Sequence, residues 1–94
     1  MATRPTIELQ SGVDNDIYAL LNAQVGYPSV TIGAQLRIQN KGNSNVYIHE
    51  GTESIEVDGG ITLPCDWQLT TSDGATGVIA TCIAANGRLS VEVI

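Results

Sequence analysis

The sequence of 94 residues contains no phenylalanine, one tryptophan, one histidine and four lysine or arginine residues. The four cations, Arg4, Arg37, Lys41 and Arg88, are scattered along the chain and form no cluster. Nucleic-acid binding requires clustered cations that displace counterions from phosphates, and anionic membrane surfaces attract the same kind of cluster. Because the net charge is −6, we expect no nucleic-acid partner, no membrane partner and an acidic surface that favours solubility.

Sequence signatures of catalysis are also missing. The chain has no GxSxG, P-loop or GxGxxG pattern. His49 has no second histidine with which to share a metal site, and its expected cross-strand neighbour, Arg37, suits neither a catalytic base nor a metal ligand. The sequence therefore predicts a protein that is not an enzyme and has no cofactor.

Two acidic segments contain candidate oxygen ligands for a metal ion. Asp14 and Asp16 flank an asparagine, but Tyr18 stands where an EF-hand has its third oxygen ligand. Aspartate and asparagine side chains also form turns by bonding to their own backbone. We favour a turn here and a plain acidic loop from Glu50 to Asp58, while ion binding by either segment stays open.

The cysteines and the hydrophobic segments bear on the cellular compartment. The first ten residues lack the apolar run of a secretory signal, and no stretch reaches the length of a transmembrane helix. We expect synthesis in the cytoplasm, where Cys65 and Cys82 stay reduced. They share the apolar faces of Trp67 and Val91, so both are expected in the core, although a disulfide stays open for a protein released from the cell.

Short alternating segments, separated by turns rich in glycine, asparagine and serine, make up most of the chain. Seven or eight strands at intervals of roughly ten residues are typical of a compact sandwich or barrel. We expect a single all-β domain over residues 1–94, a small antiparallel β-sandwich or barrel of jelly-roll-like form. Residues 1–5 are interpreted as a flexible arm.

Two segments have patterns that fit more than one kind of element. The apolar run from Asp16 to Asn22 is assigned to a strand, with one turn of helix as the alternative. Residues 60–71 are assigned to a strand that Pro64 interrupts or places at a sheet edge, because proline has no N–H to donate. Trp67 shares the apolar side of this strand, and we expect it in the core.

The clearest hairpin runs from Ala34 to Gly51. If its loop spans residues 41–45, Ile38 lies opposite Ile48 and the apolar faces of the two strands coincide. Tyr47 then lies on the polar face, where it is the best aromatic candidate for a surface contact.

A second hairpin is predicted at the end of the chain. Asn86-Gly87 is typical of a type I′ turn, in which both central residues have positive φ. The opposite face of this hairpin then carries Ile79, Ile83 and Ile94 on two adjacent strands. A contiguous exposed apolar patch usually marks an interaction site, so we predict that these three residues contact another subunit unless a loop or the N-terminal arm covers them. The core face of the hairpin is expected to carry Ala80, Cys82, Ala84, Leu89, Val91 and Val93.

The stretch LRIQNKGNSNVYIHEG and the final GRLSVEVI resemble segments of small β-structured virion proteins of tailed bacteriophages. In those proteins a strand that ends in IQN is followed by a Gly/Ser loop and a VYIYEG-like strand. The resemblance implies a virion structural component, such as a capsid decoration (cement) protein or a tail accessory protein. It assigns no catalytic or binding residue to this chain.

These observations lead to one functional expectation and one rival. We expect a non-enzymatic virion protein that binds the major capsid protein or a tail protein through its β surface, as a homo-oligomer. A trimer follows only from the analogy with decoration proteins. The resemblance also implies a location in the host cytoplasm during synthesis and on the surface of the mature virion. The rival is a carbohydrate- or ligand-binding attachment module of a phage fibre or tip, with Tyr47 as its contact.

Overall fold

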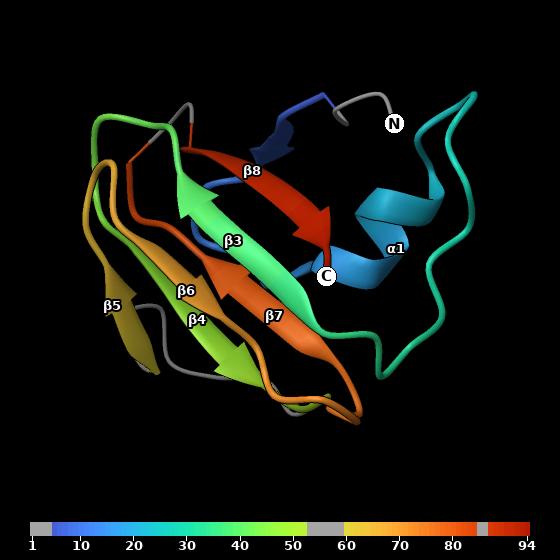
Figure 1. Ribbon diagram of the computed structural model, residues 1–94. Coiled ribbons are helices and arrows are strands. Elements are labelled where there is room, and N and C mark those ends of the chain that lie inside the picture. The colour runs from blue at the N-terminus through green and yellow to red at the C-terminus, as the bar shows by residue number, and fades with distance from the viewer. Residues whose placement is uncertain (1–4, 53–59, 85–86) are drawn as a thin grey trace.

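The computed structural model describes residues 5–52, 60–84 and 87–94. They form two four-stranded sheets in which every strand pair is antiparallel (Figure 1). The expected all-β sandwich is therefore confirmed. In chain order the elements are β1 (Ile7–Leu9), β2 (Asn15–Asp16), α1 (Ile17–Asn22), β3 (Leu36–Asn40), β4 (Val46–Glu50), β5 (Ile61–Leu63), β6 (Gln68–Thr70), β7 (Val78–Thr81) and β8 (Gly87–Val93).

The strands are connected as one long antiparallel ribbon. Sheet A has the order β1-β8-β3-β6, and sheet B has the order β2-β7-β4-β5. The first strand pairs with the last, the second with the seventh, the third with the sixth and the fourth with the fifth. Two further pairings, β3 with β8 and β4 with β7, complete the sheets where the ribbon wraps around the core.

The predicted hairpin from Ala34 to Gly51 is wrong, because β3 belongs to sheet A and β4 to sheet B. Ile38 lies opposite Leu69 and Val91 rather than opposite Ile48. The loop between the two strands crosses from one sheet to the other, and the apolar sides of both strands face the common core. Alternation identifies the buried side of each strand, but it is the same for strands that pair and for strands that face each other across a sandwich.

The predicted hairpin at the end of the chain is wrong for the same reason. Strand β7 pairs with β2 and β4, whereas β8 pairs with β1 and β3. Asn86 lies outside the described residues, and Gly87 begins β8 without a positive φ. A Cβ at Gly87 would lie 2.9 Å from the Sγ of Cys82. The glycine therefore allows a close contact where the chain passes between the sheets, in place of the expected type I′ turn.

Residues 17–22 form a helix, so their assignment to a strand is wrong and the helical alternative is confirmed. The side chain of Asp16 caps the helix by accepting a backbone hydrogen bond at 3.2 Å. Ile17, Tyr18 and Leu21 are buried. This spacing places the three side chains on one helical face, whereas a strand would send Ile17 and Tyr18 to opposite sides.

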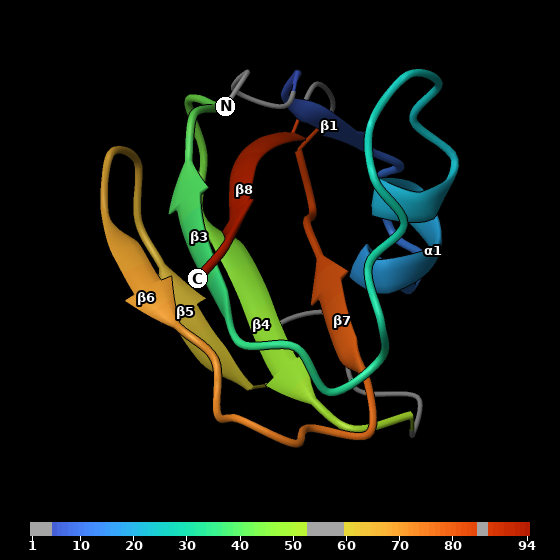
Figure 2. The same ribbon diagram turned by 45° about the vertical axis from the view of Figure 1, so that its right-hand side comes forward.

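The interruption at Pro64 is confirmed. Strand β5 ends immediately before this residue, and the chain resumes as β6 in the other sheet. Both strands are sheet edges, as a proline in the segment predicts. In Figure 2, β5 and β6 lie on one side of the sandwich, and α1 with the loop that follows it lies on the opposite side.

The core lies between the two sheets. All of its members are buried, and α1 and the loop after it contribute side chains to it. The cluster consists of Ile7, Leu9, Ile17, Tyr18, Leu21, Val30, Leu36, Ile38, Val46, Ile48, Leu63, Val78, Ala80, Cys82, Leu89 and Val91.

Candidate functional site

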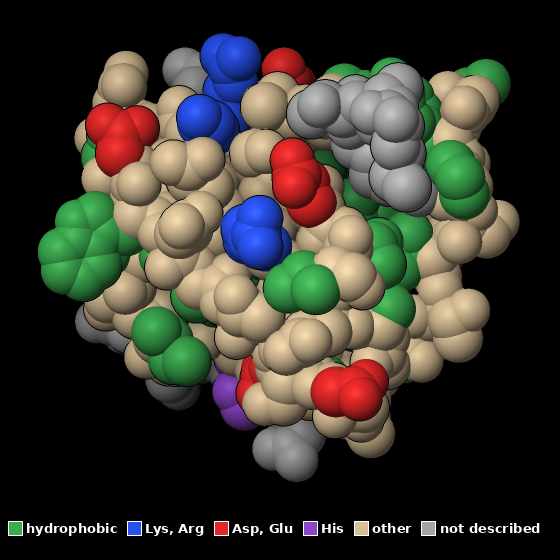
Figure 3. All heavy atoms as spheres, viewed as in Figure 1, with side chains coloured by type: hydrophobic (Ala, Val, Ile, Leu, Met, Phe, Trp, Pro, Cys, Tyr) green, Lys and Arg blue, Asp and Glu red, His purple; other side chains and the backbone are tan. Residues whose placement is uncertain are grey.

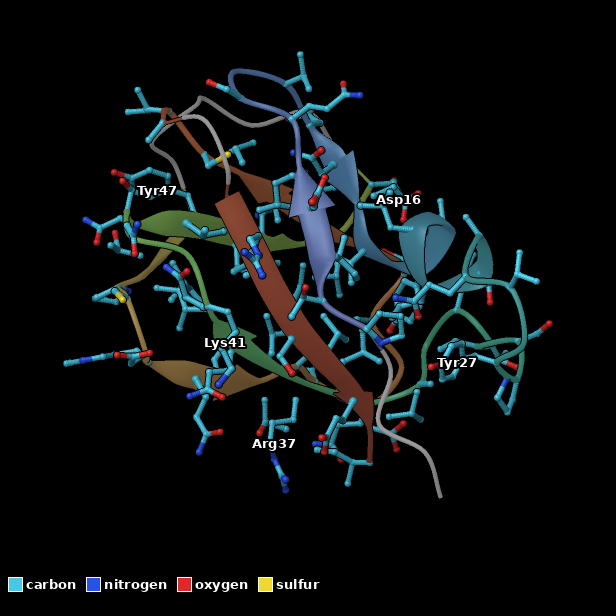
Figure 4. All side chains as sticks on the ribbon, turned by 90° about the horizontal axis from the view of Figure 1, so that it is seen from above. Asp16, Tyr27, Arg37, Lys41 and Tyr47 are labelled. Atoms are coloured by element: carbon cyan, nitrogen blue, oxygen red, sulfur yellow. The ribbon has the colours of Figure 1, made fainter. Side chains whose placement is uncertain are left out.

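A shallow polar hollow of about 140 Å³ lies on the outer face of sheet A. Its walls come from three neighbouring strands, because Arg37 lies opposite Glu92, and Gln39 lies opposite both Ser90 and Gln68. Strand alternation sends all five side chains away from the core. Figure 3 shows that this side of the molecule is mostly polar over β3 and β8, and Figure 4 shows Arg37 pointing away from the sheet.

The charges of the hollow are balanced. Arg37 supplies one positive charge and Glu92 one negative charge, while the other three side chains that line it are neutral. The set combines donors from the guanidinium, acceptors from the carboxylate, and amide and hydroxyl groups that can do both. Such a surface suits an uncharged ligand with many hydroxyl groups better than a phosphate or a metal ion.

A tight turn over Pro64–Trp67 ends directly before Gln68, which lines the hollow. The backbone N–H of Trp67 donates to the carbonyl of Pro64 at 3.0 Å. Asp66 has a φ of 67°, and it is the one residue other than glycine with positive φ in the described part of the chain. A bond from the first to the fourth residue with positive φ at the third is the pattern of a type II turn, which favours glycine or asparagine at that place.

Backbone contacts with β3 hold the strained turn in place. The N–H of Asp66 donates to the carbonyl of Asn40 at 2.9 Å, and the N–H of Asn40 donates to the carbonyl of Trp67 at 3.0 Å. The Nε2 of Gln39 donates to the carbonyl of Asp66 at 3.2 Å. Gln39 therefore belongs both to the hollow and to the support of the turn.

The fully buried side chain of Asn40 organises the chain around this turn. Its Nδ2 donates to the carbonyls of Ser44 and Leu63, both at 2.8 Å, and its Oδ1 accepts from the N–H of Gly42 at 2.9 Å. The side chain thus fixes the loop after β3 and the end of β5. Strand alternation puts Asn40 on the same side as Leu36 and Ile38, so a lone amide on a buried side is the sequence signal for this role.

Trp67 and Cys65 are exposed, which overturns their expected place in the core. The side chain of Trp67 is 65% exposed. The prediction counted alternate residues through Pro64, but β5 ends before this residue and the turn changes the direction of the chain. Cys82 is buried as expected, and neither cysteine is in a disulfide.

The three isoleucines of the predicted subunit contact do not form one patch. Ile79 is only 8% exposed, whereas Ile83 and Ile94 are about 61% and 60% exposed. Ile83 comes two residues after the end of β7 in sheet B. Ile94 comes directly after the end of β8 in sheet A. The backbone carbonyl of Ile83 accepts a hydrogen bond from the hydroxyl of Ser11, and the N–H of Ile94 donates to the carbonyl of Gln35 at 3.0 Å. Ile83 and Ile94 are therefore separate candidates for a subunit contact.

Tyr47 lies on the outer face of sheet B, opposite Thr62 and Thr81. It is half-buried, as is His49 on the same strand. Figure 4 shows Tyr47 well apart from Arg37. The structure thus separates Tyr47 from the polar hollow, which belongs to the other sheet.

The acidic segment at residues 14–16 has structural contacts. Asn15 Nδ2 donates to the carbonyls of Gln10, Val13 and Ala80, and its Oδ1 accepts from the N–H of Gln10 at 3.0 Å. These contacts, with the helix cap at Asp16, agree with the favoured turn. Within the described ranges, no group of three or more histidine, cysteine, aspartate or glutamate side chains could hold a metal ion. Most of the segment from Glu50 to Asp58 lies outside those ranges.

Two buried groups have raised pKa values. Burial raises the pKa of the Tyr18 phenol, whose hydroxyl donates to the carbonyl of Ala34 at 2.6 Å. Burial also raises the pKa of the Cys82 thiol. Both groups stay protonated at neutral pH and serve the core rather than a reactive site.

A membrane-spanning helix is not found among the residues that the structure describes. No protein-family model matches the chain, and comparisons with curated proteins and with solved structures give no match.

Proposed function

We propose that the protein is a non-enzymatic structural subunit of a tailed-phage virion, of the capsid decoration (cement) or tail accessory type. The order of the strands carries this proposal. A ribbon whose strands pair first with last and second with seventh, wrapped into two four-stranded sheets, is the wiring expected of a jelly roll. Jelly rolls recur in viral capsid and lectin domains. The resemblance of residues 36–51 and 87–94 to phage virion proteins supports the same choice.

The partner in this proposal is the major capsid protein or a tail protein. The chain would act as a homo-oligomer, with a trimer suggested by analogy, and would occupy the surface of the mature virion after synthesis in the host cytoplasm. Ile83 and Ile94 are the apolar contacts that remain from the predicted set, because Ile79 is covered within the single chain. Full burial of one such side chain contributes about 1.5–3 kcal/mol.

The test uses phage particles that lack this protein. Purified protein is mixed with them, and the bound fraction is measured by cosedimentation, while sedimentation velocity gives the oligomeric state. Ile83→Asp and Ile94→Asp should weaken binding or assembly, because each places an unpaired charge in an apolar contact. Val25→Asp is the matched control, since Val25 is an exposed apolar residue in the loop after α1. Wild-type protein that stays monomeric and does not bind capsids or tails would exclude the proposal.

A carbohydrate-binding attachment module is the second candidate. The mixed donor and acceptor groups of the polar hollow favour it, and Tyr47 on the outer face of sheet B stays its predicted aromatic contact.

A further inference from the structure

We infer that the free edge of β6 binds an extended segment of a partner protein that has basic residues at both ends. The inference rests on the proposed function, since it names the part of the chain that meets the capsid or tail protein. Strand β6 is one edge of sheet A and lies at the outer margin of the sandwich (Figure 2). The partner segment would add a fifth strand to this sheet.

The pairing of β6 with β3 shows which backbone groups of β6 are available. The N–H of Asn40 donates to the carbonyl of Trp67 at 3.0 Å. In an antiparallel pair, residues that bond to the partner strand alternate with residues that do not. Trp67 and Leu69 therefore use their backbone groups on β3. The N–H and C=O groups of Gln68 and Thr70 point to the open side of the strand.

The other sheet edges are protected in the part of the chain that the structure describes. Directly after β1, the side chain of Asn15 bonds to both the N–H and the carbonyl of Gln10. On β5, the carbonyl of Leu63 accepts from the Asn40 side chain, and Pro64 follows with no N–H to donate. Strand β2 has only two residues. Short strands, prolines and covered edges prevent unwanted pairing, whereas β6 has neither a charge nor a proline.

Apolar side chains on one side of β6 favour an added strand. Alternation puts Trp67 and Leu69 on the same side. The side chain of Trp67 is 65% exposed, and Leu69 is half-buried against the core. Pairs of aromatic and β-branched side chains on neighbouring strands stabilise a sheet. We therefore expect β-branched residues on this side of the partner segment.

Acidic groups at both ends of the edge determine the charge of the partner. Asp66 comes two residues before β6. Beyond the other end, the N–H and the hydroxyl of Ser72 donate to the carboxylate of Glu50, and Asp73 follows. All three acids are exposed. Arg37 belongs to β3, so β6 separates it from the open edge. A segment with a lysine or arginine at each end complements these charges.

The competing occupant is a second copy of this chain. Two β6 strands that pair about a two-fold axis at Leu69 bring Asp66 of one copy opposite Ser72 of the other. The Glu50 carboxylate to which Ser72 donates then meets a like charge. Each copy also has a net charge of −6. The charges therefore favour a basic segment over a second copy.

The first experiment titrates the full chain with the synthetic peptide Lys-Val-Thr-Val-Thr-Val-Lys, whose ends are blocked. Its valines match the side of Trp67 and Leu69, and its lysines are spaced to meet the acids at the two ends of the edge. We expect saturable binding that weakens as salt is added, with a change in the emission of Trp67, the chain's one tryptophan. The control peptide Glu-Val-Thr-Val-Thr-Val-Glu keeps the strand pattern and should not bind.

Amide hydrogen exchange locates the contact. The amide protons of Gln68 and Thr70 point to the open edge, so their exchange should slow when the lysine peptide binds. The amide proton of Leu69 bonds to β3 and should change little.

A charge variant tests the acids at the ends of the edge. Asp66→Asn combined with Asp73→Asn should weaken peptide binding about fivefold, since each exposed ion pair contributes modestly. Asparagine also tolerates the positive φ at position 66. Glu8→Gln combined with Glu92→Gln is the control, because it removes as many charges from β1 and β8 of the same sheet. The control should leave the affinity unchanged.

Phage particles that lack the protein separate this inference from the proposed function. Weaker cosedimentation of the Asp66→Asn, Asp73→Asn variant than of the wild type supports both. Equal cosedimentation of the two overturns the β6 edge as the contact and leaves the virion role standing. If neither binds, the virion role fails, and the peptide titration decides the inference.

The peptide experiments can overturn the inference in three ways. The lysine peptide does not bind, both peptides bind equally, or binding leaves the exchange of the Gln68 and Thr70 amides unchanged. Protection of these two amides that rises with protein concentration alone would assign the edge to a second copy and would also overturn it.

Discussion

The outer faces of the two sheets have the same strand alternation but differ in exposure. On sheet A, the outward residues of β3 and β8 are exposed or half-buried polar groups around the hollow. On sheet B, the outward residues of β7 are nearly as buried as the core, with Ile79 at 8% and Thr81 at 1% exposure. Ile79 is flanked by Asp16 on β2 and by His49 on β4.

This difference decides which face is free for a ligand or partner. An outward isoleucine in a central strand suggests an interaction patch when only the alternation is known. Because the single chain already covers Ile79, sheet B gains stability there and has less apolar surface left for association. Sheet A has the opposite character, since its outward groups contribute little to the core and are accessible.

The largest expected effect comes from truncating outward residues on the two faces. Ile79→Ala should lower the free energy of unfolding by about 2–4 kcal/mol, as for a buried isoleucine in a core. Ser90→Ala, the matched change in sheet A, should stay within about 0.5 kcal/mol. Urea denaturation measures both values. If the two changes have equally small effects, the outer side of β7 is open to solvent and the comparison fails.

The next effect concerns the contact where the chain passes from sheet B to sheet A. Gly87→Ala should destabilise the protein by about 1–3 kcal/mol, because the added Cβ would overlap the Sγ of Cys82. In the double variant with Cys82→Ala, the penalty of the Gly87 change should shrink, since the sulfur is gone. A double-mutant cycle in urea gives the coupling. A penalty that is the same with and without the sulfur would show that the contact is not the cause.

A smaller effect of opposite sign is expected at the turn beside the hollow. Asp66→Gly should stabilise the protein by about 0.5–1 kcal/mol, because glycine adopts a φ of 67° without strain. Asp73→Gly is the control, since Asp73 is exposed and has no positive φ. Here the added backbone freedom of the unfolded chain should destabilise the protein slightly. Thermal unfolding of both variants measures the difference. A loss of stability in Asp66→Gly would mean that the aspartate side chain contributes more than the strain costs.

The smallest expected effect is a fall in stability that is absent at neutral pH and develops as the pH becomes alkaline. Burial raises the pKa values of Cys82 and Tyr18 above their ordinary values of 9.0 and 10.0. Well below pH 9 both states of the protein keep these protons, so stability does not change through them. As the pH rises further, the unfolded state releases the protons first, and stability should fall. Cys82→Ala and Tyr18→Phe should each flatten this fall in urea titrations at increasing pH, and an unchanged slope would contradict the shift.

The candidate site shows how much the sequence could predict. Alternation in residues 36–40 is enough to put Arg37 and Gln39 on the side away from the core, as the structure has them. It could not bring them beside Ser90, Glu92 and Gln68, because pairing between distant strands depends on how the ribbon wraps. Trp67 was assigned to the core, since a local pattern cannot tell that the strand has ended and a turn has begun.

The sequence by itself determined the fold class, the buried sides of most strands, the break at Pro64 and the burial of Cys82. These features follow from hydrophobic alternation and from the geometry of proline, which act over a few residues. Only the tertiary structure decided the strand partners, the cover over Ile79 and the exposure of Trp67. Two strands joined by a short loop can pair in one sheet or face each other across the core with the same apolar pattern. The choice between these arrangements depends on contacts among residues far apart in the chain.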